Sequence, residues 1–319
     1  MDDLAGISEG TFLGGRYRVV EQIGSGAMAN VYRATDESLG RDVAVKIVIK
    51  SRPAVALQDT VGALQDDDAE VAVLARLNHH SLVTLLDAGV DRSEPGRPRI
   101  YLVMELVEGP DLKRRLQDGL LPPRHTAQIG YDLADALTYI HDNGVVHRDV
   151  KPGNILVFDY SHDAARMRAK LTDFGIALMS DTQQYDTGGV LGTAAYLSPE
   201  QAKSEPAGPA SDVYSLGLVL LECLTGEPVF PGDPLQSALA RLIDDPPIPH
   251  DLDPEWQQLL AAMTAREPQH RPSTREVAQA LEDLAVSIRG KHKMDTAPAT
   301  AIAADGDGGA TLEAPRGSS

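Results

Sequence analysis

The sequence predicts an α+β protein in two lobes: a small, mostly antiparallel β lobe with one main helix, and a larger lobe rich in helices. β-type runs separated by turns dominate residues 16–104, whereas helical patterns dominate residues 111–288. The chain has 319 residues and 42% hydrophobic content, enough to bury a core of this size. Residues 1–15 are expected to form a flexible leader, and residues 289–319, poor in bulky apolar side chains, a disordered tail.

Composition restricts the classes of function. The net charge of −18, from 29 basic and 47 acidic residues, disfavours sequence-independent binding to nucleic acid or anionic lipid. The single cysteine, Cys223, cannot form an internal disulfide, which favours a reducing compartment. The N-terminus lacks the pattern of a signal peptide, and the longest apolar stretch, 213–221, is shorter than the roughly 20 residues of a membrane span. We therefore expect a cytoplasmic protein without nucleic-acid or membrane partners.

Five β-type runs build the predicted small lobe, and they cover residues 17–23, 30–35, 43–46, 82–86 and 100–104. A glycine-rich turn at 24–29 joins the first two runs and allows the backbone to approach a phosphate closely. Its G-x-G-x-x-A pattern also fits a dinucleotide-binding fold, but that fold needs a helix after the turn, and the next run has β character. Residues 70–79, which begin with Glu70, have the composition of the main helix.

Helical patterns predict the large lobe, and they cover residues 111–117, 126–143, 234–243, 254–265 and 274–288. The second of these places Ile129, Leu133, Leu137 and Ile140 on one stripe, and Gly144 follows its end. A further apolar helix is expected to open at 211–217. The polar and basic stretch at 160–170 is interpreted as a surface insertion.

The stretch that carries the chemistry is 147–154, His-Arg-Asp-Val-Lys-Pro-Gly-Asn. In it Asp149 can accept a proton from an attacking hydroxyl, Lys151 can neutralise a phosphate oxygen, and the Asn154 amide oxygen can ligate a hard cation such as Mg²⁺. Each of these residues alone is as compatible with an ordinary solvated turn. The decision depends on whether other parts of a phosphoryl-transfer site follow in order.

The spacing H-R-D-x-K-x-x-N resembles the catalytic loop of the eukaryotic-like (bacterial-type) serine/threonine protein kinases, and the other motifs of that family follow. They are the glycine-rich turn at 24–29, Val-Ala-Val-Lys at 43–46, Asp-Phe-Gly at 173–175 and the Gly-Thr…Ser-Pro-Glu segment at 192–200. The resemblance covers residues 16–288 and implies the two-lobed protein kinase fold, with a hinge at 105–110. Ala29 departs from the family pattern, which has a third glycine there.

The resemblance implies roles for individual residues. Asp149 would position the substrate hydroxyl as a base, Lys151 would steady the γ-phosphate, and Lys46, paired with Glu70, would hold the α- and β-phosphates of ATP. Asn154 and Asp173 would hold Mg²⁺, with Mn²⁺ as an alternative. The nucleotide-binding residues that it implies are Ile23, Gly24, Ser25, Gly26, Ala27, Val31, Ala44, Lys46, Met104, Glu105, Val107, Asp111 and Asn154.

Two contacts of structural character are implied as well. Glu200 would form a buried ion pair with Arg271, and Asp212 would brace the backbone of the catalytic loop. The nine histidines are scattered along the chain without the spacing of a zinc cluster, and His147 is interpreted as a brace.

The implied function is transfer of the γ-phosphate of ATP to serine and threonine hydroxyls of proteins. Lys151, two residues after the base, and Thr193 resemble the serine/threonine subclass. Because Arg148 precedes Asp149, and an arginine there pairs with a phosphate on the activation loop in the family, we expect autophosphorylation within 176–191. The candidate sites are Ser180, Thr182 and Thr187, the last in the family's commonest position, and a transient homodimer would allow the reaction in trans.

Two other readings stay open. A pseudokinase scaffold would bind nucleotide and partner proteins without turnover, but such chains usually lose Lys46, Asp149 or Asp173, and all three are present. A small-molecule kinase of the aminoglycoside type would have H-G-D in place of H-R-D and would lack the Ser-Pro-Glu segment.

Overall fold

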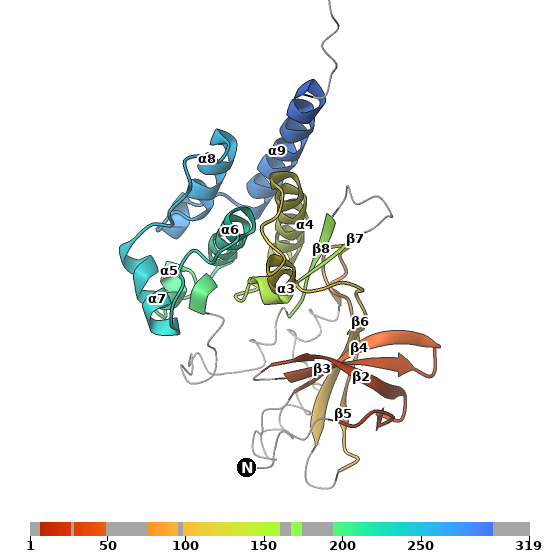
Figure 1. The fold of residues 1–319 in the computed structure, drawn as a ribbon. Helices are drawn as coiled ribbons and strands as arrows, with labels where there is room; N and C mark the ends of the chain where they lie inside the picture. The colour runs from red at the N-terminus through yellow and green to blue at the C-terminus, as the bar shows by residue number, and fades with distance from the viewer. Residues whose placement is uncertain are drawn as a thin grey trace, which may run out of the picture.

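The computed structural model describes residues 7–26, 29–48, 76–94, 98–159, 167–173 and 194–295. Within these ranges the chain forms a sheet-rich small lobe and a helical large lobe, which Figure 1 shows below and above the lobe junction. This confirms the predicted α+β class and its two-lobed arrangement. Several predicted features lie outside the described residues: Glu70 and most of its predicted helix, Ala27, Thr193, the 176–191 loop and the tail from 296 on.

The small lobe is an antiparallel sheet whose described strands have the order β1-β2-β3-β4-β6-β5. Its strands are β1 Phe12–Leu13, β2 Tyr17–Ser25, β3 Ala29–Asp36, β4 Arg41–Val48, β5 Leu85–Asp91 and β6 Arg99–Glu105. The five predicted runs are all found. β5 starts three residues later than the predicted run at 82, because Leu82 and Val83 instead pair with Leu171 of the large lobe.

The leader predicted over 1–15 is wrong for the residues from Ile7 onward. Leu13 is fully buried in the small-lobe core, and β1 pairs with β2. The Ile7 N–H donates to the Tyr32 hydroxyl at 3.1 Å. Burial of Leu13, pairing of β1 and the bond to Tyr32 therefore order a segment whose composition resembles a loop.

The large lobe is built from the helices α3 Leu112–Leu116, α4 Pro123–Asp142, α5 Pro199–Ala202, α6 Pro209–Thr225, α7 Pro234–Ile243, α8 Pro254–Met263 and α9 Thr274–Asp295. The α4 stripe of Ile129, Leu133, Leu137 and Ile140 is fully buried, as its spacing predicts. α6 lies at the centre of the lobe, between α4 and α8, and is buried almost all round.

Two predicted helix boundaries are wrong, one in each lobe. The helix predicted over 70–79 does not include 77–79, where buried Leu77 begins the turn that crosses to the large lobe. α9 continues to Asp295, past the predicted boundary at 288.

The insertion predicted over 160–170 is wrong for its second part. Residues Met167–Leu171 form strand β8, which pairs antiparallel with β7 (Ile155–Asp159) at the lobe junction. The sequence of β8 is polar, but its charged side chains have partners in the fold. Arg168 Nε donates to the buried carboxylate of Asp132 at 2.8 Å, and Lys170 Nζ donates to Glu105.

None of the described helices is long and apolar enough to cross a bilayer.

Candidate active site

The segment 145–154 connects α4 to β7, and a carboxylate of α6 holds its backbone. Asp212 is 1% exposed; its Oδ2 accepts from the His147 N–H and its Oδ1 from the Arg148 N–H, each at 2.8 Å. His141 of α4 contacts the same Oδ2 through Nε2 at 2.8 Å. The contact predicted for Asp212 is therefore present, and it joins α4, α6 and the loop.

His147 is a brace, as predicted. It is 1% exposed, its Nδ1 accepts from the Asp149 N–H at 3.2 Å, and its Nε2 lies 3.0 Å from the Thr172 carbonyl oxygen. Because Nδ1 is the acceptor, the proton of the neutral ring resides on Nε2 and is donated to Thr172. The ring thus holds Asp149 and the residue before Asp173 in one arrangement.

Asp149, Lys151 and Asn154 lie within hydrogen-bond distance of one another. Asp149 Oδ2 accepts from Lys151 Nζ at 2.8 Å and from Asn154 Nδ2 at 2.9 Å, and Asn154 Nδ2 also reaches the Asp149 carbonyl at 2.9 Å. The second oxygen, Asp149 Oδ1, is buried and has no partner among the described residues. A buried acceptor without a donor is unfavourable by roughly 1–3 kcal/mol, so this oxygen is the point where a substrate hydroxyl would gain most.

The two lobes meet at Lys46 and Asp173. Lys46 Nζ on β4 donates to Asp173 Oδ1, just after β8, at 2.7 Å, and both side chains are largely shielded from solvent. The Thr172 N–H donates to the Asn154 carbonyl at 2.9 Å, which fixes Asp173 beside the catalytic loop. The structure therefore brings Lys46, Asp149, Lys151, Asn154 and Asp173 to one junction, while Glu70 lies outside the described residues.

Several residues predicted to contact the nucleotide share one face of the small-lobe sheet. In the register of the strands, Val31 lies opposite Lys46, and Ala44 lies opposite Met104. Side chains alternate along a strand, so these four residues lie on the same face, and the face with Val43, Val45 and Ile47 packs into the small-lobe core. The face that carries Lys46 is the one directed at the large lobe, since Lys46 contacts Asp173.

The glycine-rich turn and the hinge border this face. Ile23, Gly24 and Ser25 form the end of β2, and Gly26 follows it with its N–H donating to the Ala29 carbonyl at 3.0 Å. Val107 lies in the connection after β6. Asp111, predicted to contact the nucleotide, is the N-cap of α3, where its Oδ1 accepts from the Arg114 N–H at 2.7 Å.

The side chain of Glu105 has a role that sequence reasoning missed. Its Oε1 accepts from Lys170 Nζ at 2.6 Å and from the Thr84 N–H at 2.8 Å, which ties the end of β6 to β8. The only signal in the sequence was a lysine in a strand next to the Asp-Phe-Gly motif, which we interpreted as part of an insertion. The family resemblance assigns Glu105 only to nucleotide binding.

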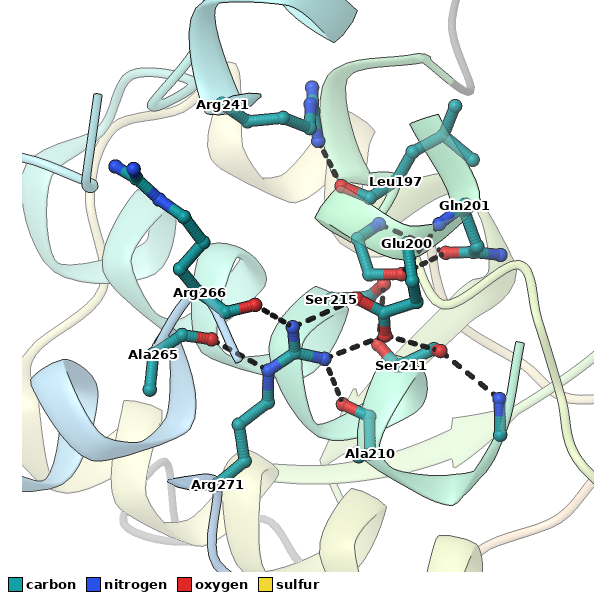
Figure 2. A network of polar contacts seen from close by, with 12 residues as sticks. Leu197, Glu200, Gln201, Ala210, Ser211, Ser215, Arg241, Ala265, Arg266 and Arg271 are labelled. Atoms are coloured by element: carbon teal, nitrogen blue, oxygen red, sulfur yellow. Dashed lines mark hydrogen bonds and ion pairs between the residues drawn. The ribbon is translucent and has the colours of Figure 1, made fainter. Parts of the chain in front are cut away.

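Glu200 and Arg271 form the predicted ion pair, and Figure 2 shows its surroundings. Arg271 donates to Glu200 through two nitrogens, at 2.7 and 2.9 Å, and Ser211 Oγ donates to Glu200 Oε1 at 2.6 Å. Burial alone would raise the pKa of Glu200, but the hydrogen bonds from Arg271 and Ser211 outweigh it and hold the pKa at about 2. Arg271 also donates to backbone carbonyls, so the buried pair is fully satisfied.

The structure also brings together His79, His80 and Asp135, although no cluster of metal-ligand type was predicted. His79 Nδ1 accepts from the Ser81 N–H at 3.2 Å, which leaves the ring proton on Nε2, 3.2 Å from Asp135 Oδ2. A protonated Nε2 has no lone pair for a metal. We interpret the group as a hydrogen-bonded brace between the turn after Leu77 and α4.

Comparison with known proteins gives consistent matches. Residues 17–281 match the family model described as protein kinase domain. The chain is 41% identical over 240 residues to serine/threonine-protein kinase PknB of Mycobacterium leprae, which covers 74% of this chain and 37% of that protein. It is 39% identical over 266 residues to serine/threonine-protein kinase PknA of Mycobacterium tuberculosis, covering 82% of this chain and 59% of that protein. The chain thus spans less than two thirds of the length of these relatives.

The Glu200–Arg271 pair predicts a pH dependence of stability. The pKa of Glu200 in the fold lies near 2, below the 4.5 of an unpaired glutamate, so its contribution is complete above about pH 5 and is lost as the pH falls toward 2. The full contribution is about 3 kcal/mol, of which about 1 kcal/mol is lost by pH 3.5. Urea unfolding of wild type and Glu200→Gln at pH 7 and pH 3.5 measures this loss.

The difference in unfolding free energy between the two proteins should shrink at the lower pH. Glu282→Gln, on the exposed side of α9, is the matched control and should show no such change. A difference for Glu200→Gln that stays constant between the two pH values would contradict the assignment.

Proposed function

This chain belongs to the protein kinase domain family, and from that premise we propose that it is a serine/threonine protein kinase, which transfers the γ-phosphate of ATP to hydroxyl groups of protein serines and threonines. The observation that carries the proposal is the Oδ1 of Asp149 beside Lys151 and Asn154, which is buried and has no hydrogen-bond partner within the described part of the chain. An acceptor held in this way is suited to receive a hydroxyl proton.

Asp149 acts as the base in the proposed reaction. Lys151 and Asn154 both donate to Oδ2, so the carboxylate cannot rotate freely and Oδ1 is left as the oxygen to accept the proton. Holding the acceptor in place before the substrate arrives lowers the entropic part of the barrier. The hydroxyl proton moves to Oδ1 while its oxygen attacks the γ-phosphorus; the bond from that phosphorus to the β–γ bridging oxygen breaks, and ADP leaves with the bonding electron pair.

Lys46 and Lys151 supply positive charge to the phosphates. Lys46 extends from the sheet face that it shares with Val31, Ala44 and Met104, and we assign the adenine to that face and the phosphates to its lysine end. Lys151 Nζ lies 2.8 Å from Asp149 Oδ2, and next to the base it would steady the γ-phosphate. Fixed cations in a shielded site stabilise the charge that develops during transfer more than they would in water.

Asn154 and Asp173 fit the requirements of a divalent cation. The Asn154 nitrogen donates to Asp149, which leaves its amide oxygen for a metal, and Asp173 contributes a carboxylate. Oxygen ligands of this kind suit Mg²⁺, or Mn²⁺ as the alternative. When bound, such an ion would neutralise charge on the phosphate oxygens.

The cytoplasmic location and the transient homodimer stay predictions.

Lys46→Met and Asp149→Asn are each expected to lower the turnover at least about 100-fold, because they remove a phosphate contact and the base without removing core packing. Transfer from labelled ATP to a generic protein substrate, followed by mass spectrometric mapping of the sites, measures this. Lys113→Met and Asp118→Asn, both at exposed positions, are the controls and should retain turnover. The proposal fails if Asp149→Asn keeps near wild-type turnover while its melting temperature is unchanged, and a pseudokinase is indicated if wild type binds ATP without turnover.

Autophosphorylation between Ile176 and Leu191 is expected to activate the enzyme, through pairing of the phosphate with Arg148. Thr187 is the first candidate, followed by Thr182 and Ser180. Phosphatase-treated wild type should regain activity on incubation with ATP, and Thr187→Ala should regain it more slowly than wild type, with Thr182→Ala as the comparison. Recovery of activity at the wild-type rate in both variants, with no phosphate mapped to this loop, would contradict the prediction.

A further inference from the structure

The peptide group before Asp149 is held from two sides. Arg148 has φ of +66°, a backbone conformation that non-glycine residues adopt only when the surroundings impose it. Its N–H donates to Asp212 of α6 at 2.8 Å, and its carbonyl accepts from Gln201 Nε2 of α5 at 2.9 Å. That carbonyl belongs to the peptide unit that leads into Asp149. Gln201 therefore fixes the plane from which the Asp149 side chain extends.

The Gln201 amide has a partner at each end. Its Oε1 accepts from the Ser198 N–H at 2.9 Å and from Ser198 Oγ at 3.1 Å, while Nε2 donates to Arg148. Gln201 is 3% exposed. A rotated amide would place its NH₂ group against the Ser198 N–H and its oxygen against the Arg148 carbonyl. The observed orientation is the one in which every contact is attractive.

The segment around Gln201 is itself anchored, as Figure 2 shows. Arg241 of α7, which is 1% exposed, donates to the Leu197 carbonyl. Ser215 of α6 donates to the Tyr196 carbonyl at 2.7 Å. Glu200, the residue before Gln201, is fixed by Arg271. Three parts of the large lobe therefore hold the short turn from which Gln201 reaches the catalytic loop.

From this arrangement we propose that Gln201 is a positioning residue for phosphoryl transfer: its amide N–H holds the Arg148 carbonyl and thereby sets the direction of the Asp149 carboxylate. The inference rests on the proposed kinase function and names a residue that contacts neither nucleotide nor substrate hydroxyl. Neither the periodicity nor the motif spacing of the sequence points to it, since the contact joins residues 53 positions apart.

Gln201→Glu tests the proposal with little change in shape. The introduced carboxylate still accepts from Ser198, as glutamate does in an ordinary capping box, but it no longer donates to the Arg148 carbonyl and repels it. When protonated, the carboxyl can again donate to that carbonyl. Burial favours the neutral form, so the donor returns as the pH is lowered. Ser198→Ala is the matched control, because it weakens the same cap while the Ser198 N–H still holds Gln201.

We expect kcat of Gln201→Glu at pH 8 to fall at least about 10-fold, with KM for ATP within about twofold of wild type, since displacement of a catalytic group by a fraction of an ångström lowers turnover strongly. The ratio of its kcat to that of wild type should rise as the pH falls from 8 to 6. Ser198→Ala should melt at a lower temperature yet keep kcat within about twofold.

A merely structural role would lower the melting temperature of Gln201→Glu without this pH-dependent ratio, and that result, or an unchanged kcat, overturns the proposal. If Gln201→Glu does not fold, Gln201→Met replaces it and should show the same loss of kcat at every pH, while retention of kcat would overturn the proposal. Wild type without turnover would refute the proposed function instead, so the two failures are distinguishable.

Discussion

One buried carboxylate determines the geometry of the site. Asp212 extends from the central helix α6 and binds two successive backbone N–H groups of the catalytic loop as well as His141 of α4. A buried carboxylate needs donors, and a loop needs partners for its backbone, so each satisfies the other. Because α6 is packed within the core of the large lobe, its hydrogen bonds to the loop fix the loop relative to that core. Asp149, Lys151 and Asn154 all follow within six residues of this anchor.

Strand β8 and the residues after it define how the lobes meet. Lys170 contacts Glu105 at the end of β6, and Asp173, three residues later, contacts Lys46 on β4. The two ion pairs have opposite polarity: in the first the large lobe supplies the cation, and in the second it supplies the anion. Half-buried pairs of this kind contribute more to register than to net stability, since desolvation offsets much of their attraction. The nucleotide-binding face and the base are aligned by the same short strand.

The site was predictable from the sequence wherever local spacing determines it. Residues 147–154 and the run ending at Lys46 were found because strand and turn geometry places such neighbours together, and the α4 stripe because helical periodicity determines which side chains face the core. Gln201 and Arg241 were missed because their partners lie 53 and 44 positions away in the sequence. Leu13 was missed because it is an isolated apolar residue in a segment rich in turn-forming residues. β8 was misread because its polar side chains resemble a surface loop until Asp132 and Glu105 are placed beside them.

The central claim is that Asp212 holds the catalytic loop in its working conformation, and hydrogen exchange of Asp212→Asn tests it most directly. An asparagine replaces one acceptor oxygen by a donor, so at least one of the His147 and Arg148 N–H groups would lose its partner. We predict faster amide exchange at 147–149 than in wild type, a large loss of turnover, and unchanged exchange in the small-lobe sheet. Unchanged exchange at 147–149 together with wild-type turnover would contradict the claim.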